Sequence, residues 1–184
     1  SPYQLNPMNL NPLRGALLKS VDFERLEGCR AVKLFVSATN VKTGKVRVFK
    51  SGEITPDVLL ASACLPFLFQ AVTVDGEPYW DGGYMGNPSI FPLIYGSETS
   101  DVVIVQVNPL GCDRVPTTAT EIMNRVNEIS FNSSMMREMR AISFVTDLID
   151  AGKLGAGEYK RVNVHWIEAE KQMKGLGVSS KLNT

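Results

Sequence analysis

The sequence has few of the residues on which metal sites and disulfide frameworks depend. Its 184 residues include one histidine, His165, and three cysteines, Cys29, Cys64 and Cys112, with no C-x-x-C pair. A structural zinc site needs four nitrogen or sulfur ligands at short spacings, and a disulfide framework needs an even set of cysteines. We therefore expect neither in this chain.

Net charge and long apolar runs are also missing. The 19 basic and 19 acidic residues give a formal net charge of zero, so no long-range field favours nucleic acid. No stretch approaches the roughly 20 apolar residues of a transmembrane helix, and no basic segment followed by an apolar one opens the chain as a signal peptide does. The hydrophobic content is 44%, enough for a sizeable core. Since no repeat or linker interrupts the sequence, we predict a single domain over residues 1–184.

Capping residues indicate two helices in the first half of the chain. Asn11 stands before Pro12 and predicts a helix over residues 12–20, since asparagine caps helices and proline suits the first helical position. Thr55 before Pro56 repeats this pattern, and Pro66 is expected to end the second helix.

Turn residues indicate two hairpins. A strand over residues 31–41 and a second over 43–49 are rich in β-branched residues and meet at Thr43-Gly44. The Asp75-Gly76 pair predicts another hairpin, whose second strand delivers Asp81 at its end.

The second half alternates strands and helices. The nearly continuous apolar run at 101–109 predicts a strand buried on both faces, with helices on both sides. Apolar residues recur at helical spacing from 120 to 150, which fits one long helix or two in succession. A closing strand within 159–170 places Val162, Val164 and Trp166 on one face. This alternation predicts a mixed α/β domain.

One carboxylate stands out, in the stretch GEPYWDGGYMGNP at residues 76–88. Asp81 lies between an aromatic pair and two glycines, Gly82 and Gly83. Glycines permit a tight turn and also let another chain segment or a substrate approach closely. Taken alone, Asp81 is therefore either a turn acid bonded to nearby amides or part of an active site.

Three stretches together favour the active site. In chain order, VKLFVSATNVKTGKVRVF, LLASACLPFLFQAV and YWDGGYMGNPSIFPL resemble the patatin-like acyl hydrolases and phospholipases, particularly the bacterial members. In that family an aspartate in D-G-G or D-G-A pairs with a serine in G-x-S-x-G, and a glycine-rich loop forms the oxyanion hole. The resemblance implies that Asp81 is a catalytic base and that Gly82 and Gly83 complete its motif.

The resemblance also implies a fold and a substrate class. The expected fold is a three-layer α/β/α sandwich with a central, mostly parallel sheet, and the expected reaction is hydrolysis of lipid or other carboxylic esters. Neither a metal nor an organic cofactor is required. An apolar substrate groove could be lined by Leu65, Phe67, Phe69, Tyr84 and Met85, although core packing is the alternative use of such residues. Peripheral contact with a lipid surface is a further expectation.

The sequence departs from the family in one decisive way. It contains no G-x-S-x-G, the nearest stretch being GVSSK at residues 177–181, and it lacks the glycine-rich oxyanion segment. In this family both precede the aspartate. We therefore expect the chain to be the C-terminal part of a patatin domain, incomplete at its N-terminal side and inactive alone. A bared sheet edge should make it dimerise, aggregate or stay bound to the missing segment of the same protein.

Two alternatives remain open. The chain could be a non-catalytic module that keeps the fold and uses its surface to bind a partner chain or lipid. His165 could instead complete a Ser-His-Asp triad with an upstream serine, since Ser, Asp, His is the chain order of α/β-hydrolases. Against the triad, His165 falls inside a predicted strand rather than on a loop beyond its end.

Overall fold

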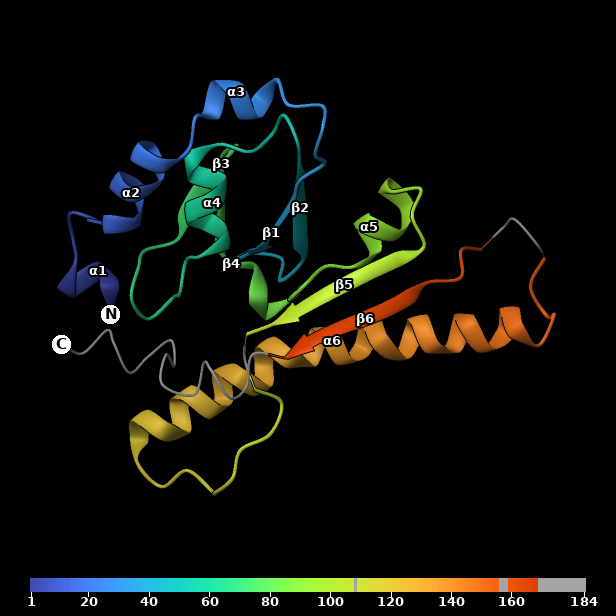
Figure 1. Cartoon of the computed structure of the whole chain (residues 1–184). Helices are drawn as coiled ribbons and strands as arrows, with labels where there is room; N and C mark the ends of the chain where they lie inside the picture. Colours follow the sequence, from blue (N-terminus) through green and yellow to red (C-terminus); the bar gives the residue numbers. More distant parts are fainter. Residues whose placement is uncertain (108, 156–158, 169–184) are drawn as a thin grey trace. The chain divides into compact units, whose positions relative to one another are not determined.

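The computed structural model describes residues 1–107, 109–155 and 159–168 (Figure 1). Contacts divide the chain into two compact units, the first ending at Ser89 and the second beginning at Ile90. The single domain expected from the sequence stays a prediction. The GVSSK stretch lies outside the described residues.

Short helices surround the sheet of the first unit. Asn11 caps its second helix by accepting a hydrogen bond from the Leu13 amide, and Thr55 accepts one from the Val58 amide. The helix predicted after Asn11 is confirmed with its bounds. The helices are α1 (Pro2–Leu5), α2 (Pro12–Ser20), α3 (Phe23–Glu27), α4 (Pro56–Ser62) and the 3₁₀ turn η1 (Gly82–Tyr84).

Helix α4 ends earlier than the sequence predicts, at Ser62 rather than near Pro66. Leu65, which precedes the proline, is disfavoured in the helical conformation. Its carbonyl instead opens a separate turn and accepts hydrogen bonds from the amides of Leu68 and Phe69, each at 3.0 Å.

The sheet of the first unit consists of two hairpins joined edge to edge. Its strands are β1 (Phe35–Asn40), β2 (Val46–Lys50), β3 (Val72–Val74) and β4 (Glu77–Asp81), in the order β2-β1-β4-β3 with every pair antiparallel. Both hairpins were predicted and are confirmed. Their turns use positive φ, at +67° for Gly44 and at 51° and 78° for Asp75 and Gly76. The second turn is a two-residue hairpin, with Val74 opposite Glu77, and such turns favour glycine and positive φ.

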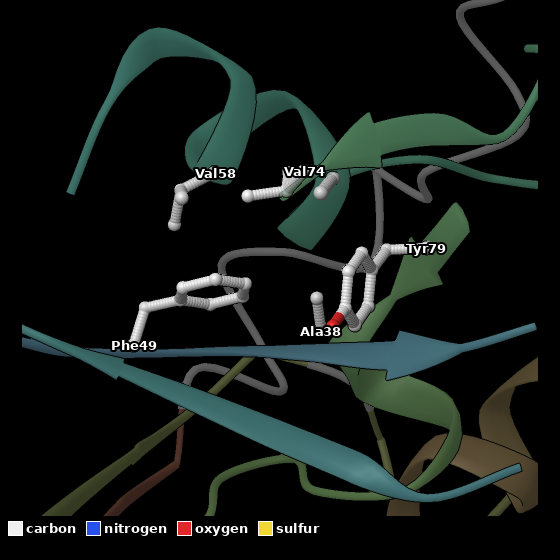
Figure 2. Close-up of a cluster of buried hydrophobic side chains, with 6 residues drawn as sticks. Ala38, Phe49, Val58, Val74 and Tyr79 are labelled. Carbon is white, nitrogen blue, oxygen red and sulfur yellow. The ribbon is translucent and has the colours of Figure 1, made fainter. Parts of the chain in front are cut away.

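A small core fastens α4 to this sheet (Figure 2). Phe49 and Tyr79 are 1% and 3% exposed, and their rings meet edge to face with centroids 5.7 Å apart. Val58 of α4 is buried in the same cluster. The remaining buried members are Ala38, Ala61 and Val74.

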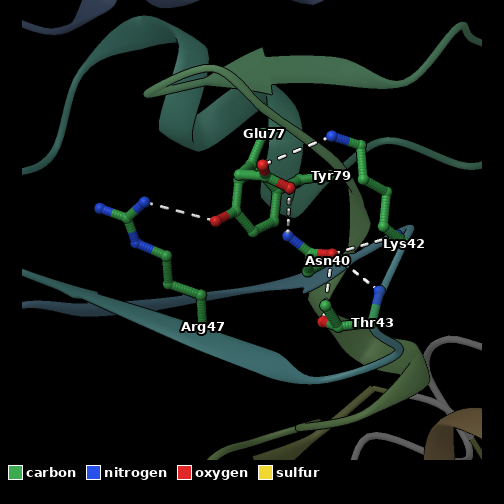
Figure 3. Close-up of polar contacts among 6 residues, drawn as sticks. All are labelled: Asn40, Lys42, Thr43, Arg47, Glu77 and Tyr79. Atoms are coloured by element: carbon green, nitrogen blue, oxygen red, sulfur yellow. Dashed lines mark hydrogen bonds and ion pairs between the residues drawn. The ribbon is translucent and has the colours of Figure 1, made fainter.

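Polar contacts hold the β1–β2 turn against β4 (Figure 3). The Asn40 side chain accepts hydrogen bonds from the Lys42 and Thr43 amides and donates one to Glu77. Lys42 forms an ion pair with the same glutamate. Arg47 donates to the Tyr79 hydroxyl at 3.3 Å. The register between β1 and β4, which decides what surrounds Asp81, is therefore fixed at the end of β1.

The second unit has one parallel strand pair and one long helix. Its elements are α5 (Phe91–Gly96), β5 (Asp101–Gln106), α6 (Ala119–Asp150) and β6 (Asn163–Glu168). The apolar periodicity from 120 to 150 is therefore one helix, which Thr118 and Glu121 begin with a capping box. Strands β5 and β6 pair in parallel with Asp101 opposite Asn163.

Strand β5 is buried on one face only, contrary to the prediction. Val102 and Ile104 pack with Met135 of α6, whereas Val103 and Val105 are 58% and 63% exposed. Within the described residues, helices therefore do not cover both sides of the strand. The predicted face of β6 is confirmed, since Val162, Val164 and Trp166 all join the same apolar cluster.

Helix α5 is held at both ends by charged side chains of its own unit. Glu138 of α6 accepts the Ile90 amide at 2.7 Å, and Lys160 donates to the carbonyls of Ile94 and Ser97. A negative group at the start of a helix and a positive one at its end both complement the helix dipole. A cavity of about 760 Å³ opens beside them, lined mainly by apolar residues such as Ile142.

The mixed α/β class is confirmed, with one difference in the sheets. The larger sheet is antiparallel, and among the described residues only β5 and β6 pair in parallel. The three-layer sandwich stays a prediction. Within the described part of the chain, no helix is both long and apolar enough to cross a membrane.

Candidate active site

Asp81 is the last residue of β4, and its backbone amide and carbonyl both form hydrogen bonds to other segments. Its amide donates to the carbonyl of Cys64 at 2.9 Å, and its carbonyl accepts the Thr39 hydroxyl at 2.8 Å. On β1, Ala38 lies directly opposite. Asp81 is therefore placed by two segments distant in sequence, and its side chain starts from a fixed backbone.

The carboxylate of Asp81 is oriented by the glycine motif that follows it. Its Oδ1 accepts the Gly83 amide at 2.7 Å, and the Gly82–Tyr84 turn begins at this capping interaction. Only one carboxylate oxygen is engaged by this bond, so the other can accept a proton from a further group.

Gly82 makes the closest backbone approach in the motif. A β carbon at this position would lie 2.1 Å from the Ser37 carbonyl oxygen, much shorter than any van der Waals contact. The hydroxyl of Ser37 donates to the Gly86 carbonyl at 3.0 Å. Ser37 and Thr39 alternate along β1 and thus share a face, and together they hold both ends of the D-G-G-Y-M-G segment.

The environment makes Asp81 a better proton acceptor than an exposed aspartate. Burial raises its pKa above the ordinary value, and the hydrogen bond from the Gly83 amide opposes this rise. Desolvation disfavours the charged form of a carboxyl group. An ionised Asp81 therefore gains more on accepting a proton than a solvated carboxylate does.

Two further titratable side chains adjoin Asp81. The pKa of the Cys64 thiol is raised to about 11, chiefly by burial and to a smaller extent by the nearby Asp81 charge. Burial likewise raises the pKa of Tyr84, with the charge of Asp81 as a second cause. A thiol with so high a pKa stays protonated near neutrality and is a poor nucleophile, so the chemistry of this site centres on the carboxylate.

His165 lies in β6 with a carboxylate partner of its own. Its Nε2 is 3.0 Å from Asp101 Oδ1, and both side chains are more than half exposed. This hydrogen bond, together with one from Asn163, lowers the pKa of Asp101. The histidine thus occupies the strand face expected from the sequence, and its contact is an exposed cross-strand pair.

The residues expected to line a groove all belong to the first unit. Phe67 and Met85 are exposed, at 67% and 41%, whereas Leu65, Phe69 and Tyr84 are partly buried. None of them belongs to the buried core cluster of this unit. Their role as a groove stays a prediction.

Comparison with known families assigns the region that contains this site. Residues 5–94 match the family of patatin-like phospholipases. This part of the chain is patatin-like. The match covers all four strands of the first unit together with Asp81, Gly82 and Gly83, and it confirms the resemblance. A comparison with curated proteins gives no match.

The patatin-like segment contains supporting residues that the sequence alone did not single out. Ser37, Thr39 and Cys64 touch the D-G-G segment through contacts that span 49, 42 and 17 residues of sequence. The only available signal was that Ser37, Thr39 and Cys64 lie in two of the stretches that resemble the family. Their contacts depend on the strand register, which no single stretch reveals.

The raised pKa of Asp81 leads to a stability prediction. Because the folded-state pKa lies above that of the unfolded chain, Asp81 favours the folded state at low pH and loses this contribution as the pH rises through the folded pKa. Asparagine keeps an oxygen for the Gly83 amide but has no charge to desolvate. We expect the stability of Asp81→Asn relative to the parent chain to increase from about pH 3 to about pH 7.

Urea denaturation of both chains across this range measures the effect. Subtracting the difference at low pH removes any pH-independent cost of the substitution. If the stability difference between Asp81→Asn and the parent chain stayed constant or fell with increasing pH, burial would not control the pKa of the Asp81 carboxyl group.

Proposed function

We propose that this chain supplies the acid-base residue of a serine acyl hydrolase that cleaves carboxylic esters of lipids. The observation that supports the proposal is the state of Asp81. Its carboxylate is partly buried, has a raised pKa and is oriented by Gly83 within a patatin-like segment. Members of this family are generally hydrolases, and Asp81 has the properties that a general base requires.

In the proposed mechanism Asp81 acts with a serine as a dyad. Asp81 accepts the proton of the serine hydroxyl while the serine oxygen bonds to the ester carbonyl carbon. It returns the proton to the departing alcohol when the carbon–oxygen bond breaks and an acyl-enzyme remains. Water then loses a proton to Asp81 as it attacks the acyl carbon, and the serine is released with that proton.

The serine must come from outside these 184 residues, since they contain no G-x-S-x-G. Backbone amides that stabilise the oxyanion, worth roughly 10²- to 10³-fold per donor, would come from the same source. A segment of the same protein or a second copy of it is the proposed partner. The isolated chain is accordingly proposed to be inactive and to take up no fluorophosphonate probe.

The test is turnover of a short-chain nitrophenyl ester by the full-length gene product. Asp81→Asn is expected to lower kcat/KM by about 10²- to 10³-fold, because the serine loses its base while the hydrogen bond to Gly83 can persist. His165→Ala is the matched control and should leave turnover within about twofold, since this side chain contacts Asp101 at the surface.

Three outcomes distinguish the candidate functions. Loss of turnover with Asp81→Asn alone supports the dyad. Equal loss with His165→Ala would replace it with a Ser-His-Asp triad. Full-length protein without a G-x-S-x-G segment and without turnover would favour a non-catalytic patatin-fold module that binds a partner chain or lipid.

Leu65, Phe69, Tyr84 and Met85 are proposed, with Phe67, to border the acyl chain of the substrate. The stretch 65–69 starts directly after Cys64, whose carbonyl is bonded to the Asp81 amide, and Tyr84 and Met85 follow the glycine motif. Both stretches therefore begin next to the backbone of Asp81. The pairing of an apolar lining with one oriented polar group is typical of small-molecule sites.

A further inference from the structure

The cavity beside α5 has the size of a small-molecule site, and the proposed function does not use it. Its volume is about 760 Å³, within the range of roughly 300–1,000 Å³ that ligand pockets occupy. Its lining comes from α5 and the residues after it, from α6, and from the segment that leads into β6. All of these belong to the second unit. We call this feature the α5–α6 cavity.

Apolar side chains form most of the lining. Ile142 and Val145 come from α6, Ile94 comes from α5, and Val162 directly precedes β6. Ala141 of α6 contributes only a methyl group, which leaves space in front of the helix. Such a lining accepts the hydrocarbon part of a ligand, because removing apolar surface from water is favourable.

Two charged side chains of the lining are engaged with the ends of α5. Glu138 accepts the Ile90 amide at 2.7 Å, and Lys160 donates to the carbonyls of Ile94 and Ser97. Each charge thus lies at the helix end of opposite partial charge. Together they add no net charge to the cavity.

Glu98 leaves the lining with an excess of negative charge. Its side chain is exposed, and within the described part of the chain no hydrogen bond or ion pair engages its carboxylate. The two carboxylates of Glu98 and Glu138 against the one ammonium of Lys160 give the lining a formal net charge of −1. This charge attracts a cation and repels an anion, and it acts more strongly next to apolar walls than in bulk water.

Three aromatic rings also belong to the lining. Phe91 and Tyr95 lie one turn apart on α5 and are 45% and 86% exposed, and Tyr159 is 51% exposed. Rings that remain so exposed have surface available to a ligand. The face of an aromatic ring attracts a cation, and several such rings together recognise quaternary ammonium groups. The charge of Glu98 and these rings therefore favour the same class of ligand.

We infer that the α5–α6 cavity binds an organic cation with an apolar body, such as an alkylammonium compound. The hydrocarbon part packs against Ile142 and Val145, and the ammonium group lies beside Glu98 and the ring of Tyr95. The inference uses no residue of the Asp81 site. It goes beyond the proposed function and does not rest on it.

Isothermal titration calorimetry of the 184-residue chain tests the preference for a cation. The probes are dodecyltrimethylammonium, dodecyl maltoside and dodecanoate, which share one tail and carry a positive, a neutral and a negative head group. Each is used below the concentration at which it forms micelles. We expect the cation to bind about tenfold more tightly than the neutral probe, and the anion to bind most weakly. Equal affinities, or tighter binding of dodecanoate, would overturn the inference.

Substitutions of exposed side chains test the residues that select the head group. Glu98→Gln and Tyr95→Leu should each lower the affinity for dodecyltrimethylammonium about three- to fivefold and leave that for dodecyl maltoside within about twofold. Glu27→Gln, at an exposed glutamate of the first unit, is the matched control and should change neither affinity. If Glu98→Gln weakened both probes alike, or neither, the carboxylate would not select the head group and the inference would fail.

Filling the cavity tests the location of the ligand. Ala141→Phe should lower the affinity for dodecyltrimethylammonium and for dodecyl maltoside about tenfold or more, because its ring occupies the space of the tail. Ser143→Phe is the control, since Ser143 lies on α6 outside the lining. Asp81→Asn should bind as the parent chain does, so a failed dyad would leave the result intact. Binding that survives Ala141→Phe would overturn the inference. A chain that binds none of the probes would do so too and would assign the cavity to contact with a protein segment.

Discussion

Replacing Gly82 with alanine is expected to lower the free energy of unfolding of the first unit by about 3 kcal/mol or more. The added β carbon would lie 2.1 Å from the carbonyl oxygen of Ser37 and 2.5 Å from its carbonyl carbon. Both are backbone atoms of β1, so no side-chain rotation can relieve the clash. Strand β1 must separate from the start of the D-G-G turn, which disturbs the pairing of Ala38 with Asp81.

Gly15→Ala is the control for this experiment. A β carbon on Gly15 meets nothing within 4 Å, and alanine is favoured over glycine inside a helix by up to about 1 kcal/mol. Urea denaturation should therefore show opposite signs for the two glycine-to-alanine changes. A cost below about 1 kcal/mol for Gly82→Ala would mean that β1 does not approach the motif so closely.

Phe49→Ala is expected to lower the free energy of unfolding by about 3–5 kcal/mol, the usual range for a buried phenylalanine. Phe49 is 1% exposed and packs against Tyr79 of β4 and Val58 of α4. The Arg47 guanidinium also lies 4.3 Å from the ring centroid. Truncation leaves a cavity at the junction of helix and sheet and removes this cation–π contact.

Two other phenylalanine substitutions make the result interpretable. Phe49→Leu keeps most of the buried volume and should cost less than about 1.5 kcal/mol. Phe144→Ala removes an exposed ring and should change stability by less than about 0.5 kcal/mol. Similar effects of Phe49→Ala and Phe144→Ala would show that Phe49 is not at the centre of this core.

Local sequence signals predicted both hairpins, helix α2 and the start of α4 in the first unit, whereas α1 and α3 were not predicted. The turns at Gly44 and at Asp75-Gly76 require positive φ, which few residues tolerate, and the structure has it at each of them. The Asn11 cap likewise marks the true start of α2. Such signals work because the relevant energies arise within a few neighbouring residues.

Signals that depend on packing partners were less informative. An apolar run such as residues 101–107 is compatible with a strand covered on both faces or on one, and in β5 the side chains of Val103 and Val105 remain exposed. The candidate site shows the same limit. Asp81 and its glycines could be identified from their motif, whereas the contacts of Ser37 and Thr39 depend on how β1 and β4 are aligned. Alignment of distant strands is a property of the assembled sheet.

The two charged contacts of α5 bear on the order in which the second unit folds. A helix from Phe91 to Gly96 is too short to be stable alone. Its N-terminal partner, Glu138, and its C-terminal partner, Lys160, lie 48 and 63 residues further along the chain from the groups they bind. To form contacts between such distant residues, the intervening chain must close into a long loop and lose conformational entropy. Such contacts therefore form late in folding. Helix α5 should therefore be among the last elements to gain protection from hydrogen exchange during refolding, after α6 has formed.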